Sequence, residues 1–157
     1  MNDMIVRLYD LPDAAEDIKA FREKGVVVKR AMSLEKRIVV KWVEETFGQW
    51  WGPETETAFD NSPPTCFIAS KGKELLGFAV YDATCKNFFG PTGVTEKHRG
   101  NGIGRVLMLS AFHAMRNDGY AYGIIGSAGP VDFYKKVLDA QVIEKSVPGV
   151  YEDLLRN

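Results

Sequence analysis

The stretch EKHRGNGIGR, residues 96–105, places three glycines at alternate positions between two arginines. Glycine costs backbone entropy and weakens a helix start, so the run from Gly100 to Gly104 indicates either a tight turn or a close approach to a ligand. An apolar helical pattern follows, and a helix N-terminus attracts anions through its free amides and its dipole. Arg99 and Arg105 add positive charge. The stretch therefore predicts a phosphate or pyrophosphate site, with a purely structural turn as the alternative.

The spacing of the glycines restricts which kind of phosphate ligand the loop could bind. A dinucleotide fingerprint needs G-x-G-x-x-G, whereas Gly104 follows Gly102 after one residue, which is one position too early. The P-loop string G-x-x-x-x-G-K-[ST] does not occur in the sequence. A nucleotide-binding protein that uses the same loop is therefore a weaker hypothesis.

Residues 94–107, VTEKHRGNGIGRVL, closely resemble the acyl-CoA signature of the GCN5-related N-acetyltransferase (GNAT) family, R-x-x-G-x-G followed by an apolar helix. The resemblance implies that backbone amides of residues 100–105 hold the CoA pyrophosphate. It also implies that the preceding strand end runs beside the pantetheine arm, with an amide near Val94 polarising the acetyl carbonyl. The implied acetyl-CoA contacts are Gly93, Val94, Arg99, Gly100, Asn101, Gly102, Ile103, Gly104 and Arg105.

A second segment, FYKKVL at residues 133–138, resembles a later helix of the same family. In that family the tyrosine of this helix often protonates the departing CoA thiolate, which makes Tyr134 the implied catalytic acid. A phenol with a pKa near 10 is protonated at neutral pH and can donate to a thiolate. Packing against Leu138, four residues on, is the structural alternative.

The acceptor side has no matched motif. Residues 48–64 look irregular because they contain Gly48, Gly52, Pro53 and a final Pro-Pro pair, so we expect a long aromatic loop here. The aromatic residues around it indicate an apolar or cation-binding wall for the acceptor, or else core packing. They are Phe47, Trp50, Trp51 and Phe59.

The base that takes the amine proton is not identifiable from the sequence. Glu54 or Glu56 could face an amine, although an exposed carboxylate is the more ordinary reading. Asp82 and Glu45 are further carboxylate candidates with the same ordinary reading. His98 and His113 are weaker candidates, and Cys85 could instead be an acyl-carrying nucleophile, although ordinary packing is its plainer role.

The composition of the chain restricts the classes of protein to which it could belong. The chain has 157 residues, 45% hydrophobic and 26% charged, and a net charge of −1, so we expect one globular core and no general attraction for nucleic acid or an anionic membrane. Cys66 and Cys85 form no C-x-x-C pair, which argues against a metal site and fits a reducing compartment. Residues 1–10 lack a signal-peptide pattern, and no run approaches the roughly 20 apolar residues of a membrane span. We therefore expect a cytoplasmic protein without a metal.

The elements that must position these residues follow the order β-α-β-α-β-β-β-α-β-α-β-β. Periodicity and turn residues predict an α/β fold, and the resemblance implies a mixed, mostly antiparallel central sheet of about six to seven strands flanked by about four helices. The Gly90-Pro91 pair is a natural place for its strand to part from a neighbour. Expected strands are 4–9, 26–32, 65–70, 74–83, 87–95, 120–128, 142–146 and 149–155; expected helices are 10–24, 33–47, about 103–118 and 129–140.

These features together predict a single acyl-CoA N-acyltransferase domain over residues 1–157. Residues 1–64 would form the acceptor-side half and residues 65–145 the acetyl-CoA-binding half. The expected reaction is direct transfer of an acetyl group from acetyl-CoA to a primary amine of an unidentified acceptor. A catalytically silent acyl-CoA-binding module is the alternative, and a homodimer stays open because many members of the family are dimers.

Overall fold

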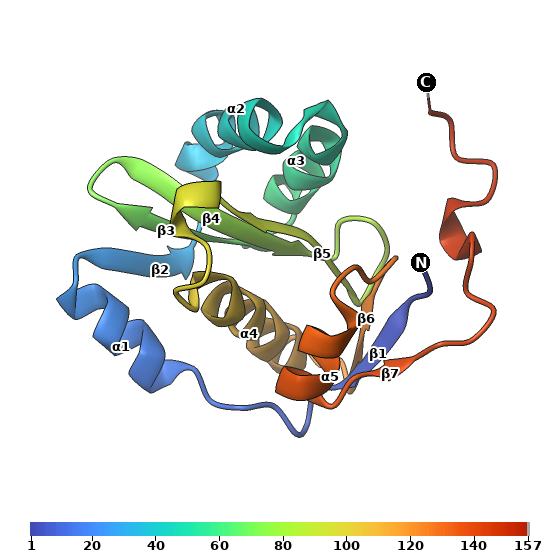
Figure 1. Cartoon of the computed structure of the whole chain (residues 1–157). Helices are drawn as coiled ribbons and strands as arrows, with labels where there is room; N and C mark the ends of the chain where they lie inside the picture. The colour runs from blue at the N-terminus through green and yellow to red at the C-terminus, as the bar shows by residue number, and fades with distance from the viewer. Residues whose placement is uncertain (157) are drawn as a thin grey trace.

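A computed structural model describes residues 1–156, and its centre is one seven-stranded sheet with the order β2-β3-β4-β5-β6-β1-β7 (Figure 1). Neighbouring strands are antiparallel except β5 and β6. This confirms the predicted mixed, mostly antiparallel sheet. The strands are β1 (Met4–Arg7), β2 (Val26–Arg30), β3 (Cys66–Lys71), β4 (Glu74–Tyr81), β5 (Phe88–Val94), β6 (Tyr122–Ile125) and β7 (Gln141–Val142).

Helices cover both faces of the sheet. In Figure 1, α2 and α3 lie above it and α1 and α4 lie below it. The helices are α1 (Ala15–Glu23), α2 (Lys36–Phe47), α3 (Gly52–Asp60), α4 (Ile103–Asn117) and α5 (Val131–Leu138). Single 3₁₀ turns occupy Ser33–Glu35, Gln49–Trp51, Glu96–His98 and Gly149–Tyr151.

Strand β4 divides its side chains between two cores. Phe78 and Val80 belong to the cluster under α2 and α3, whereas Ala79 and Tyr81 belong to the cluster around α4. This alternation is the period of two expected for a strand that is buried on both faces. A register shift between Ala69 and Ser70 of β3 marks a bulge, which lets Leu76 join the α4 cluster.

Strand β5 parts from β6 soon after it begins. The parallel pairing involves only Phe88 with Ile124 and Phe89 with Ile125, while β5 stays paired with β4 as far as Val94. The separation begins at Gly90-Pro91, as the sequence predicts. Proline has no amide to donate to a neighbouring strand, which is why it marks the end of a ladder.

Residues 48–64 differ from the predicted irregular loop, because residues 52–60 form α3. Pro53 lies in the first turn of α3, where its missing amide has no intrahelical partner to lose. An added Cβ at Gly52 would meet the side chain of Glu44, which is exposed and would have to move aside where the chain turns from α2 into α3. The Gly-Pro pair starts a helix here, and the prediction of a loop was wrong.

The predicted final pair of strands, 142–146 with 149–155, is also absent from the described residues. Only Gln141–Val142 pairs, with Ile5 and Met4 of β1, and residues 149–151 form a 3₁₀ turn. Positive φ angles at Lys145, Gly149 and Asp153 turn the chain away from an extended path. Residues 143–156 run along one side of the molecule, beyond β7 (Figure 1).

Candidate functional site

The glycine loop leads into the N-terminus of α4. Gly100 and Gly102 have φ angles of +82° and +86°, a region that side chains other than glycine rarely adopt. The first intrahelical bond runs from the Val106 amide to the Gly102 carbonyl at 3.1 Å, so the amides of the first turn have no carbonyl within the helix. Open space surrounds the Cα of Gly100. The loop therefore has the backbone that a phosphate needs.

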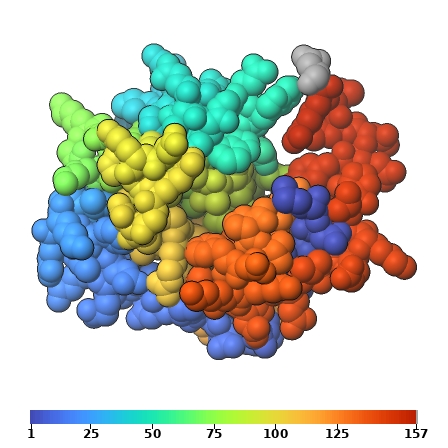
Figure 2. Space-filling view, viewed as in Figure 1, coloured from blue at the N-terminus to red at the C-terminus, as the bar shows by residue number. Residues whose placement is uncertain are grey.

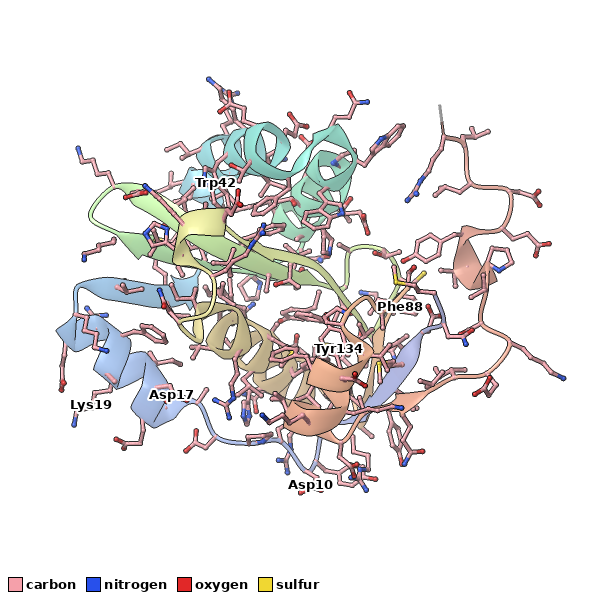
Figure 3. The ribbon with its side chains drawn as sticks, in the orientation of Figure 1. Asp10, Asp17, Lys19, Trp42, Phe88 and Tyr134 are labelled. Atoms are coloured by element: carbon pink, nitrogen blue, oxygen red, sulfur yellow. The ribbon has the colours of Figure 1, made fainter. Side chains whose placement is uncertain are left out.

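The two arginines that flank the loop have different surroundings. Arg99 is exposed, and its Nε donates to the Val94 carbonyl at 3.0 Å, which ties the loop to the end of β5. Arg105 is paired with Asp17 of α1, with 2.9 Å between Arg105 NH1 and Asp17 Oδ2. A cavity of about 260 Å³ lies beside this pair and is also lined by Asn101 and Gly102. Three of the nine predicted acetyl-CoA contacts, Asn101, Gly102 and Arg105, thus line one opening, and Figure 3 labels Asp17 on α1.

The end of β5 presents backbone groups on the side where β6 has departed. The Thr95 amide donates to the Leu76 carbonyl of β4 at 2.8 Å, so the amide of Thr95 faces β4. Because successive residues of a strand face opposite directions, the amides of Thr92 and Val94 face away from β4. The Arg99 contact with the Val94 carbonyl agrees with this direction. Val94 is a predicted contact residue, and Thr92 is one that the sequence did not indicate.

Gly93 and Phe47, predicted on different sides of the site, contact each other. An added Cβ at Gly93 would lie 2.7 Å from Phe47 Cε1, so the absence of a side chain lets α2 approach β5. Phe47 packs on Trp42, Trp51 and Phe78, with ring centroids 5.4–5.5 Å away. Core packing accounts for Phe47, as the alternative in the sequence analysis allows.

A cavity of about 590 Å³ lies where β5 and β6 diverge. One wall comes from β5 and includes Gly90, Pro91 and Thr92. The opposite wall comes from the end of β6 and from α5, and it includes Tyr134. The segment 147–156 closes one side through Val147, Pro148, Tyr151 and Arg156, and Figure 2 shows this segment in red at one side of the molecule.

Tyr134 lies in the first turn of α5 (Figure 3). Only 6% of the residue is exposed, and it lines the cavity. Burial raises the pKa of its phenol above the ordinary 10.0, because a phenolate would lose hydration there. Tyr134 is therefore protonated at neutral pH, and its side chain lines the cavity.

The aromatic residues of the predicted acceptor wall lie in different surroundings in the structure. Trp51 lines the cavity and packs on Phe47 and Phe78. Trp50 is 47% exposed, and the Arg156 guanidinium lies 6.0 Å from its ring centroid. Of the three predicted residues, only Trp51 reaches the cavity surface.

The candidate carboxylates differ in whether they line the cavity and in their hydrogen-bond partners. Glu54 of α3 is the one acidic residue in the described cavity lining, and its Oε2 accepts a hydrogen bond from the Thr84 hydroxyl. Asp82 accepts from the Asn87 amide and from the Tyr120 hydroxyl, which gives it a structural role. Glu45 and Glu56 are exposed on the helices and lie 3.8 Å from lysines.

The remaining candidate bases and nucleophiles have structural partners or lie outside the cavity lining. His98 Nδ1 is 2.8 Å from the Thr95 hydroxyl, and His113 Nε2 is 2.7 Å from the Pro12 carbonyl. Cys66 is buried, and Cys85 is half-buried beside Thr84. Among residues 1–156 no group of His, Cys, Asp or Glu side chains is arranged to hold a metal.

Sequence reasoning missed the cavity residues that come from distant parts of the chain. Thr84 lies in the β4–β5 connection, and Tyr151 and Arg156 lie near the C-terminal end of the described chain. No local motif marks them, because tertiary contacts alone bring them to β5. No helix of the described residues is long and apolar enough to cross a membrane.

Comparisons with known proteins agree with this geometry. Residues 36–138 match the family model described as Acetyltransferase (GNAT) family. No curated protein shows significant sequence similarity to the chain.

Solved structures of acetyltransferases share the fold. A fungal glucosamine N-acetyltransferase region of a multi-domain GH3 β-N-acetylglucosaminidase has a TM-score of 0.70 at 15% identity, over 90% of this chain and 19% of that chain. A GCN5-related N-acetyltransferase from Sphaerobacter thermophilus has a TM-score of 0.68 at 19% identity, over 90% and 48%. A Brucella melitensis GNAT acetyltransferase in complex with acetyl-CoA has a TM-score of 0.56 at 16% identity, over 71% and 80%. This chain therefore spans about a fifth of the length of the fungal protein and about half of the length of the Sphaerobacter thermophilus protein.

Proposed function

This chain belongs to the GNAT acetyltransferase family, and we propose that it transfers an acetyl group from acetyl-CoA to the primary amine of an acceptor. One observation carries the proposal. The glycine loop at the start of α4 and the buried phenol of Tyr134 are joined by one strand, β5, whose free side opens onto the cavity that Tyr134 lines. The Brucella melitensis neighbour binds acetyl-CoA, which supports the choice of acyl donor.

The residues present fit acetyl-CoA. Gly100 has no neighbouring atom within 4 Å of an added Cβ, and Gly102 has only Phe21 Cζ at 3.9 Å, so a pyrophosphate can approach the backbone there. The first-turn amides of α4 would hold it, aided by the helix dipole and by Arg99. From there the amides of Thr92 and Val94 would guide the pantetheine arm along β5 into the cavity.

The chain's own groups supply the requirements of acetyl transfer. A free β5 amide, that of Val94 or Thr92, polarises the acetyl carbonyl, because a preorganised donor stabilises the developing oxyanion. The neutral amine forms its bond to the carbonyl carbon, and the carbon–sulfur bond breaks. Tyr134 donates its proton to the departing sulfur. The amine loses one proton to a cavity carboxylate or water, and this proton restores the phenol.

The two sides of the cavity divide the work within one domain. Residues 65–145 contain β5, the loop and Tyr134, and they would bind acetyl-CoA. Trp51 and Glu54 of the first 64 residues, with the segment 147–156, would contact the acceptor. The assignment extends the acceptor side beyond the N-terminal half, because the C-terminal segment lines the same cavity.

Binding followed by turnover tests the proposal. We expect calorimetry to detect acetyl-CoA binding that CoA displaces and ATP does not. An amine panel of amino acids, polyamines, amino sugars and short peptides should then include acceptors that release free CoA thiol. Thiol detection needs a correction for the half-buried Cys85, whereas Cys66 is inaccessible in the folded protein.

The outcomes separate enzyme from binding module. If acetyl-CoA binds and no amine in the panel releases thiol, the chain is a silent acyl-CoA-binding module. If ATP displaces acetyl-CoA competitively and binds at least as tightly, the loop is a nucleotide site and the proposal is wrong.

A further inference from the structure

The acceptor end of the cavity carries one negative and one positive side chain, and neither is neutralised within the protein. Glu54 and Arg156 are the charged side chains among the described lining residues. None of the ion pairs between residues 1–156 involves either of them. A charge that lines a cavity without a partner is available for a ligand of opposite charge.

Glu54 is held in place by a neutral partner. Its Oε2 accepts a hydrogen bond from the Thr84 hydroxyl, and both residues are half-buried in the cavity wall. This bond orients the carboxylate but leaves its charge uncompensated, so Oε1 can accept from an ammonium group. The carboxylate Asp3 also lies close by, but it is 7% exposed and its Oδ1 accepts the Ser127 amide at 2.7 Å.

Tyr151 lines the same cavity as the two charged side chains. An added Cβ at Gly126 would lie 2.8 Å from the Tyr151 hydroxyl, so the phenol rests against the end of β6. Burial raises the pKa of Tyr151, and the negative charges of Glu54 and Asp3 raise it further, while Arg156 lowers it. The hydroxyl is therefore a neutral donor that feels both charges of this end.

Arg156 is positioned by an aromatic face. Its guanidinium lies 6.0 Å from the ring centroid of Trp50, which itself lies outside the cavity lining. A planar guanidinium presents paired donors that match a carboxylate, and stacking on an aromatic ring leaves those donors free. Trp50 is thus a positioning residue for Arg156.

From these contacts we infer that the acceptor is a small molecule carrying both an amine and a carboxylate, such as a free amino acid. The inference rests on the proposed function. Glu54 holds the ammonium group before transfer, and Arg156 holds the carboxylate. A polyamine is disfavoured because its second cation would lie against the cation of Arg156. A multiply charged amino sugar is disfavoured because Glu54 alone would have to pair with several ammonium groups. The cavity of about 590 Å³ also holds the acetyl end of the donor, which limits the acceptor to a small size.

Matched acceptor pairs test this inference. Free amino acids of several side chains are compared with their α-amides and with the corresponding decarboxylated amines, using release of CoA thiol. We expect kcat/KM for the amino acid to exceed that of its amide by about tenfold or more, the usual effect of one charge-assisted pair. ω-Amino acids of increasing length then report the spacing between the two charges.

Variants assign the two charges separately. Arg156→Gln should remove the preference for the amino acid by raising its KM, while rates with the amide stay near wild type. Trp50→Leu should act in the same direction, because the guanidinium loses its aromatic support. Glu54→Gln should lower kcat/KM for amino acids and amides alike. Arg37→Gln, an exposed position on α2 outside the cavity lining, is the control and should change nothing.

The results distinguish this inference from the proposed function. If amides and simple amines are acetylated as well as amino acids, and Arg156→Gln changes neither, the zwitterionic acceptor is wrong and the acetyltransferase stands. If no amine of either kind releases thiol although acetyl-CoA binds, the proposed function itself fails.

Discussion

Tyr134, the proposed acid, is also a packing residue. Its ring belongs to the core cluster around α4, and its edge lines the cavity beside β5. Burial keeps the phenol neutral by raising its pKa, so the packing that the sequence offers as an alternative role is also what makes the residue a suitable acid. The two readings of Tyr134 therefore support each other.

Tyr134→Phe separates these two roles, because phenylalanine keeps the ring and removes the proton. We expect kcat to fall by about a hundredfold or more, the usual contribution of a general acid, while the Kd for acetyl-CoA stays within about twofold. Steady-state kinetics and calorimetry measure the two quantities. A wild-type kcat in the variant would remove the acid role.

The pH dependence of kcat offers an independent check on the same group. Because the pKa of Tyr134 is raised above 10.0, the loss of rate due to its ionisation should have its midpoint above pH 10. A fall of kcat that tracks a group titrating near neutral pH, and that persists in Tyr134→Phe, would show that another residue limits the rate.

At the scale of elements, the contact between α4 and β5 connects the loop to the cavity. The Arg99 side chain bonds the end of β5, and an added Cβ at Gly104 would make only an ordinary contact with a Val94 methyl group, 3.5 Å away. At Gly93 an added Cβ would lie 2.7 Å from Phe47 of α2, so glycine is what permits this helix to approach β5. Of these two glycines, Gly93 is therefore the one that helix packing requires.

Replacement of Gly102 tests the loop against a matched control in the same helix. Gly102→Val should weaken acetyl-CoA binding by about tenfold or more, because a branched side chain blocks the approach to the first-turn amides. Gly119, at the far end of α4, also has a positive φ, +106°, and open space around it. Gly119→Val carries similar backbone strain and should bind acetyl-CoA like the wild type.

Calorimetry on both folded variants decides the loop assignment. Equal losses of affinity would point to a general effect of strain on α4. Wild-type affinity in folded Gly102→Val would show that the pyrophosphate binds elsewhere.

At the scale of the whole molecule, the two core clusters share one sheet, so burial in either supports both faces. Cys66 belongs to the cluster under α2 and α3 and is fully buried. Burial, together with the nearby Glu35 charge and against the opposing charge of Arg30, raises the pKa of its thiol from 9.0 to about 12. The folded protein therefore resists ionisation of a group that the unfolded chain ionises readily.

This difference makes the free energy of unfolding depend on pH in a defined window. The contribution of Cys66 is fully present below about pH 9 and is lost as pH rises towards about 12, with a total of about 4 kcal/mol. Tyrosines whose pKa values are also raised in the folded protein, Tyr81, Tyr134 and Tyr151 among them, add to the loss of stability as pH approaches 10, so the difference between the wild type and Cys66→Ala is what isolates the thiol. Denaturant unfolding between about pH 9 and 10 should show a steeper loss of stability in the wild type than in Cys66→Ala.

Cys85→Ala supplies the control and should keep the full pH dependence of stability. A thiol reagent at neutral pH should label Cys85 and leave Cys66 unreacted in the folded protein, because only Cys85 is partly accessible. If Cys66→Ala and the wild type lose stability in parallel, the thiol is not the group responsible.

The sequence by itself determined the features that depend on local geometry. The glycine loop, the helix after it and the paired strands β3 and β4 follow from residue spacing and turn chemistry, which act between near neighbours in the chain. The parting of β5 from β6 at Gly90-Pro91 was also predictable, because proline cannot continue a ladder. Helix α3 was missed because its initial Gly-Pro was interpreted as a break, although a helix can start with it.

Only the tertiary structure decided which side chains surround the cavity. Trp51, Thr84, Tyr134 and Arg156 are far apart in the sequence and line the same cavity. The segment after β7, which pairs with β1, returns to the end of β6, where Tyr151 lies against Gly126. The same packing removed Phe47 from the acceptor wall and singled out Glu54 among the carboxylates. Local spacing can specify a phosphate-binding loop because a few successive amides suffice, whereas an acceptor site needs groups from several elements whose proximity is set by the whole fold.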